Sequence, residues 1–168
     1  EYAAVRKEME SVAEYLGKSV LREVDEDEFM KNIADIRSSC GDRAVLRAMH
    51  FYGDNARVEK QAAALKAGDF ETFKKYIIES GRSSYMYNQN VYSCKKASEQ
   101  PVSLALSLSE KLLDGCGAWR VHGGGFAGTI QAFVPLNKLD EYKDLMEKVF
   151  GSGSCYILSV RPVGGVEL

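Results

Sequence analysis

The sequence predicts an α+β fold in which helices pack on one face of an antiparallel sheet. Three observations support this prediction. Helical periodicity runs through the chain up to about residue 113, two short strands then flank a cluster of glycines, and a further helix and strand pattern follows. At 168 residues and 45% hydrophobic composition, the chain can bury a core of its own.

Helices dominate the N-terminal part. Apolar residues recur there at three- and four-residue spacing, and acidic residues stand at positions that suit helix N-caps. Ser38–Gly41 is expected to be a loop, while Gly68 and Asp69 predict a tight turn between two helices of a hairpin. The expected helices cover residues 2–16, a short stretch after Asp25, residues 42–67 and residues 70–80.

The segment 81–100 is polar and rich in tyrosine. It lacks the interleaved basic residues of a nucleic-acid stacking surface, so we expect a surface loop that covers the core or faces another domain. Pro101 suits the first turn of the helix that follows. The remaining expected elements are a helix from Pro101 to Gly115, strands at 118–122 and 128–134, a helix capped by Asn137 and ended by Gly151, and strands at 155–160 and 164–168.

The stretch from Arg120 to Gly128 contains four glycines within six positions, Gly123, Gly124, Gly125 and Gly128. Without a Cβ, such a loop can adopt positive φ and aim its N–H groups at an anion or at another loop. The glycine spacing also satisfies the dinucleotide fingerprint, but that fingerprint requires a helix to follow and here a strand follows. A tight β-hairpin without a ligand is the open alternative.

Several function classes can be set aside. The net charge of −2 gives no basic footprint for nucleic acid. No apolar run approaches the roughly 18 residues that a membrane span needs. The four cysteines are far apart and do not cluster with the histidines, so we expect reduced thiols in a cytosolic protein rather than disulfides or a zinc site.

Candidate catalytic residues are few. His50 lies within a predicted helix and is expected to be structural. His122 immediately precedes the glycine cluster, but no nucleophile stands near it in a recognisable context, so no triad is predicted. The chain begins at Glu1 directly in a helical pattern, which we interpret as the start of a fragment.

The run Arg-Val-His-Gly-Gly-Gly-Phe-Ala-Gly at 120–128 resembles the third sequence motif of galactokinases, within the larger family of galactose, homoserine, mevalonate and phosphomevalonate kinases. Arg-Ala-Met-His at 47–50, with Asp54-Asn55 and Arg57-Val58, is similar to their R-A-x-H…E-N-x-R-V helix. Further similarity at 2–24, 65–70 and 79–80 extends the resemblance over essentially the whole chain. It implies a single C-terminal kinase domain over 1–168, with a ferredoxin-like core and an N-terminal helical region.

The chain also departs from the family pattern. His122 stands where threonine is usual, Ala127 replaces a glycine, and a Tyr-x-Val-Ser-x-Pro-Glu segment is not clearly present in 85–101. We interpret these changes as a divergent bacterial-type branch. They leave open whether the sugar is galactose or N-acetylgalactosamine.

The resemblance implies that the full-length protein phosphorylates galactose at its C1 hydroxyl in the cytoplasm. ATP and Mg²⁺ would be bound mainly by an N-terminal half, which also carries the catalytic residues, so no catalytic or metal-binding residue is assigned in this chain. Tyr2 matches a family tyrosine that contacts the sugar, and the loop Gly123–Gly128 would adjoin the phosphate site. The roles of Arg120 and His122 stay open.

Three functions remain possible at this point. The first is the C-terminal domain of a galactokinase, whose isolated chain would fold but not phosphorylate galactose. The second is a galactokinase-like sugar sensor or transcriptional regulator without turnover. The third is a stand-alone α+β binding module.

Overall fold

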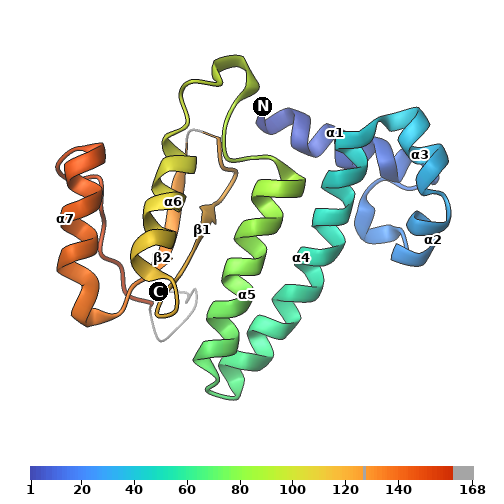
Figure 1. Ribbon diagram of the computed structural model, residues 1–168. Coiled ribbons are helices and arrows are strands. Elements are labelled where there is room, and N and C mark those ends of the chain that lie inside the picture. The colour runs from blue at the N-terminus through green and yellow to red at the C-terminus, as the bar shows by residue number, and fades with distance from the viewer. Residues whose placement is uncertain (127, 161–168) are drawn as a thin grey trace, which may run out of the picture. The chain divides into compact units, whose positions relative to one another are not determined.

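The computed structural model describes residues 1–126 and 128–160, and Figure 1 shows their helices and strands. The chain divides into two compact units, the first covering Glu1–Phe133 and the second beginning at Val134. The predicted α+β class is confirmed, because the described elements are helices and a two-stranded antiparallel sheet.

The first unit opens with a helical region built around one apolar cluster. Asp25 is the N-cap that the sequence predicted, since its carboxylate accepts hydrogen bonds from the N–H groups of Asp27 and Glu28 at 2.9 and 3.4 Å. Val12, Phe29 and Ile36 are buried in the shared core. The elements are α1 (Tyr2–Tyr15), a 3₁₀ turn (Leu21–Glu23), α2 (Glu26–Lys31), α3 (Ile33–Cys40) and the long helix α4 (Asp42–Lys66).

The predicted loop at Ser38–Gly41 is wrong. Helix α3 continues through Cys40, and the turn into α4 is confined to Gly41, whose φ is 90°. Cys40 packs against the apolar cluster, and its thiol lies 3.5 Å from the carbonyl oxygen of Ser11 on α1. This tertiary contact extends the helix by one turn beyond what the local polar sequence suggests.

Helices α4 and α5 (Phe70–Ser83) form the predicted hairpin, which Figure 1 shows as two long antiparallel helices. Asp69 caps α5, and its carboxylate accepts a hydrogen bond from the N–H of Thr72 at 3.0 Å. Phe73 and Ile77 are buried on the face that packs with Ala64 of α4.

The predicted surface loop at 81–100 is wrong in its first half. Helix α5 continues to Ser83 and passes into a turn of π-helix, Ser84–Asn88, which we call the π-turn. Asn88, Asn90 and Val91 are all buried. After them comes only a short 3₁₀ turn, Cys94–Lys96.

Helix α6 (Pro101–Leu113) leads into the predicted β-hairpin of β1 (Ala118–His122) and β2 (Thr129–Phe133). The register runs from Ala118 opposite Phe133 to His122 opposite Thr129. Helices α5 and α6 both pack against β1. At Gly81 of α5, an added Cβ would lie 2.9 Å from the Cβ of Arg120, so the absent side chain lets the helix cross close to the strand.

The second unit contains a 3₁₀ turn (Leu136–Lys138) and the amphipathic helix α7 (Leu139–Phe150). Asn137 is not its N-cap, because the residue lies inside the 3₁₀ turn and the helix begins after Lys138. The strand expected at 155–160 is also wrong: no residue of this stretch pairs in a sheet within the described part of the chain. The strand expected at 164–168 lies outside the described residues.

Candidate functional site

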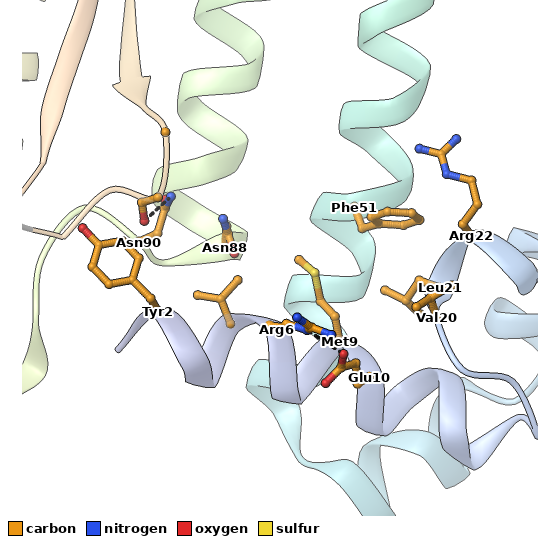
Figure 2. A pocket seen from close by; sticks show the side chains of 13 residues that line it. Tyr2, Arg6, Met9, Glu10, Val20, Leu21, Arg22, Phe51, Asn88 and Asn90 are labelled. Atoms are coloured by element: carbon orange, nitrogen blue, oxygen red, sulfur yellow. Dashed lines mark hydrogen bonds and ion pairs between the residues drawn. The ribbon is translucent and has the colours of Figure 1, made fainter.

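A cavity of about 480 Å³ lies in the first unit, beside α1 and the start of the β-hairpin loop. Figure 2 shows Tyr2 and Asn90 at one end and Phe51 and Arg22 at the other, with Met9 of α1 between them. Most of the lining is apolar. Its polar side chains are Tyr2, Arg6, Glu10, Arg22, Asn88 and Asn90, and its backbone includes Gly123 and Gly124.

Tyr2, which the sequence predicted as a sugar contact, meets the loop Gly123–Gly128, hereafter the glycine loop. Its hydroxyl donates a hydrogen bond to the carbonyl oxygen of Gly125 at 2.8 Å. Its ring packs edge-on against Phe126 with centroids 5.2 Å apart. The side chain is still 56% exposed, so one side of it faces the cavity mouth. Tyr2 and the glycine loop, which lie far apart in the sequence, therefore form one surface.

The glycine loop approaches other parts of the same chain very closely. Gly123 and Gly125 have φ of 62° and 78°, a region that L side chains rarely adopt. A Cβ added at Gly124 would overlap the ring of Tyr2, and one added at Gly125 would overlap the carbonyl group of Asn90. The close-approach prediction is therefore satisfied within this chain, by Tyr2 and Asn90, and the predicted hairpin is present as well.

Arg120 and His122 are positioned differently. Arg120 lies against Gly81 of α5, and its Nε donates to the carbonyl oxygen of Val121 at 3.1 Å. His122 is exposed at the end of β1. Neither side chain lines the cavity, so the structure does not bring them together with Tyr2.

Arg47 was named from the sequence only as part of a helix motif, without a role, and its side chain is only 1% exposed. Its Nε donates to the carbonyl oxygen of Asn88 at 3.0 Å, and its terminal nitrogen pairs with the carboxylate of Glu8 on α1 at 2.8 Å. Arg43 also pairs with Glu8, at 2.6 Å. Burial alone would raise the pKa of Glu8, but its hydrogen bonds and the charges of Arg43 and Arg47 outweigh this and lower the pKa.

His50 is buried between α4 and α5, where its Nδ1 lies 2.9 Å from the hydroxyl oxygen of Ser83. Burial lowers the pKa of His50, which favours the neutral imidazole. Asp54 beside it accepts hydrogen bonds from Ser80 and Arg57. These contacts fit the structural role that was expected for His50.

The described residues offer neither a cluster of metal-binding side chains nor a membrane-spanning helix. Within residues 1–126 and 128–160, no group of three or more histidine, cysteine or acidic side chains is close enough to hold a metal ion. In the same part of the chain, no helix combines the length and the apolar character that crossing a bilayer requires. The four cysteines are free thiols.

Comparison with known proteins gives a consistent set of relatives. No protein-family profile matches the chain. It is 31% identical to the galactokinase of Homo sapiens over 168 residues, which is all of this chain and 40% of that protein. It is 31% identical to the galactokinase of Bos taurus over 158 residues, covering 94% and 37% of the two chains. With the galactokinase of Mannheimia succiniciproducens it shares 25% identity over 146 residues, covering 87% and 36%.

These matches identify the chain as a kinase-related domain. More narrowly, it is related to the galactokinases, as the sequence motifs predicted, and it corresponds to their C-terminal domain. The chain spans about two fifths of the length of the human protein.

Proposed function

We propose that the chain is the C-terminal domain of a longer galactokinase, which transfers the γ-phosphoryl group of ATP to the C1 hydroxyl of galactose in the cytoplasm. Similarity to galactokinases over the whole chain supports this proposal. The observation that carries it is the 2.8 Å hydrogen bond from Tyr2 to Gly125, because it joins the expected sugar contact to the glycine loop.

The remainder of the longer protein would bind ATP and Mg²⁺ and supply the catalytic residues. No group of three or more histidine, cysteine or acidic side chains gathers among the described residues, and none of these residues is assigned as a magnesium ligand. We therefore assign no metal-dependent step to this chain. Its partners in this proposal are the N-terminal half of the same protein and the sugar.

Phosphoryl transfer depends mainly on positioning and on stabilisation of charge. In this proposal Tyr2 positions the sugar. Its hydroxyl proton is directed to Gly125, so its oxygen lone pairs are left to accept a hydrogen bond from a sugar hydroxyl. Tyr2 would thus fix the sugar relative to the glycine loop, and the loop would adjoin the transferred phosphate.

The proposed function is tested by assaying formation of galactose 1-phosphate from galactose and Mg-ATP. We expect turnover by the full-length protein and none by residues 1–168 alone, because the catalytic groups lie in the other half. N-acetylgalactosamine serves as the competing sugar. Full-length protein that binds galactose without turnover would instead be a sugar sensor or regulator. Product formed by residues 1–168 alone would contradict the proposal that the catalytic groups lie in the N-terminal half.

Replacement of Tyr2 by phenylalanine in the full-length enzyme is expected to lower kcat/KM for galactose by roughly two- to tenfold, and to affect ATP less. This is the effect expected from losing one hydrogen bond. Steady-state kinetics with each substrate varied in turn measure it. Tyr15→Phe, at the other end of α1 and outside the cavity lining, is the matched control and should leave both values unchanged. Equal effects on both substrates would make Tyr2 a structural residue.

A further inference from the structure

Asn90 contacts three successive residues of the glycine loop. Its carbonyl oxygen accepts a hydrogen bond from the N–H of Phe126. Its side-chain Nδ2 donates to the carbonyl oxygen of Gly124 at 3.3 Å. Between these two bonds, Gly125 lies so close to the Asn90 carbonyl that a Cβ could not fit. Main chain and side chain of one residue therefore hold the loop on both sides of Gly125.

The side-chain amide of Asn90 has a defined orientation. The residue is only 4% exposed, and Oδ1 has no hydrogen-bond partner within the described part of the chain. An exchange of Oδ1 and Nδ2 would bring two oxygens together at Gly124, so the donor must point at the loop. A buried amide oxygen without a partner is unfavourable, and packing alone would be served better by an apolar residue of similar size. The bond from Nδ2 to the Gly124 carbonyl oxygen is what ties this buried side chain to the loop.

The backbone that carries Asn90 is itself fixed. The N–H of Gln89 donates to the carbonyl oxygen of Ser84 at 2.8 Å and closes the π-turn. The buried guanidinium of Arg47 donates to the carbonyl oxygen of Asn88 and pairs with Glu8. Hydrogen bonds thus tie α1 and α4 to Asn88, the main chain leads from Asn88 to Asn90, and hydrogen bonds of Asn90 hold the glycine loop. Figure 2 shows both asparagines beside the cavity.

We propose that Asn90 is the positioning residue of the glycine loop in the kinase reaction. It acts through the main chain of Gly124 and Phe126, and this role rests on the proposed function. Asn90 makes no bond to Tyr2 among the described contacts, and the loop reaches Tyr2 only through Gly125 and Phe126, so loosening the loop should lower kcat more than it raises KM for galactose. Loss of a side chain that only fills the core would lower stability but would not lower kcat selectively over KM.

Asn90→Asp and Asn90→Ala in the full-length protein test this role. The aspartate keeps the shape but replaces the donor with an acceptor that faces the Gly124 oxygen. The alanine also removes the unpartnered Oδ1, which limits the loss of stability and keeps the test usable if the aspartate variant does not fold. Val91→Ala is the control for the loss of a buried side chain: Val91 is the next residue, is fully buried and does not line the cavity.

Amide hydrogen exchange at Gly124–Phe126 is measured together with kcat and KM. We expect exchange in both Asn90 variants to be about two- to tenfold faster than in the parent protein, and kcat to fall by a similar factor with a smaller change in KM for galactose. Val91→Ala should leave loop exchange at the parent value. Unchanged exchange and kcat in Asn90→Ala would overturn the proposal, as would an equal fall in kcat in Val91→Ala. A parent protein without kinase activity would refute the proposed function alone, since exchange still tests the loop contact.

Discussion

Gly125→Val in the full-length protein is expected to lower kcat/KM for galactose phosphorylation by about 100-fold, the effect of an ångström-scale misplacement of a reacting group. A valine at φ of 78° is strained, and its Cβ would overlap the carbonyl group of Asn90. The loop must move away from Asn90 and from the hydroxyl of Tyr2. The change is local to the loop tip, so the domain should remain folded. Steady-state kinetics and circular dichroism measure the two effects.

Gly17→Val is the control for backbone strain. Gly17 also has positive φ, 72°, but a Cβ added there would meet no heavy atom within 4 Å. This variant should lose stability without losing activity. Full activity in Gly125→Val, or equal losses in the two variants, would show that close approach of the loop does not matter for turnover.

Glu8→Gln is expected to lower the free energy of unfolding by about 3 kcal/mol, because it leaves the buried guanidinium of Arg47 without its carboxylate partner. Denaturant unfolding measures this loss. The pKa of Glu8 is lowered in the folded state, so its contribution is present at neutral pH and is lost as the pH falls below about 4.3. Glu8→Gln should accordingly flatten the acid side of the stability profile.

Glu10→Gln provides the comparison on the same helix. Glu10 pairs with Arg6 at 2.7 Å, but the Arg6 side chain is 83% exposed, and an ion pair screened by water in this way contributes little to stability. Two variants with the same small loss of stability would contradict a central role for the buried pair.

Elements with local signals were predicted well. The long helix was expected at 42–67 and lies at Asp42–Lys66, because its apolar spacing and flanking glycines are local features. Asp25 and Asp69 act as caps through hydrogen bonds to residues two or three positions away. A signal of this kind requires no knowledge of the tertiary structure.

Elements that depend on distant partners were predicted poorly. The polar segment after residue 80 was expected on the surface, yet its backbone receives a bond from Arg47, 41 positions earlier in the chain. A polar residue is buried where such a partner exists, and composition cannot reveal the partner. Residues 155–160 have strand-forming side chains, but such side chains stabilise a strand only when it pairs with a neighbouring strand.

The site was predicted in part. The glycine cluster was evident from composition, and Tyr2 was named only through the resemblance to galactokinases. Their contact joins residues 123 positions apart, which no sequence pattern indicates. Arg120 was named for its position in the glycine motif, but it lies against α5 rather than in the cavity.

Gln89 and Phe126 both adopt left-handed backbone conformations, each with φ of 54°, although neither is a glycine. Such conformations persist only while their surroundings enforce them. Gln89 immediately precedes Asn90, and the N–H of Phe126 donates to the carbonyl oxygen of Asn90, so this bond joins the two strained turns. Release of one turn removes one of the restraints on the other. The two turns should therefore unfold and refold together, as one cooperative unit rather than as two independently fluctuating loops.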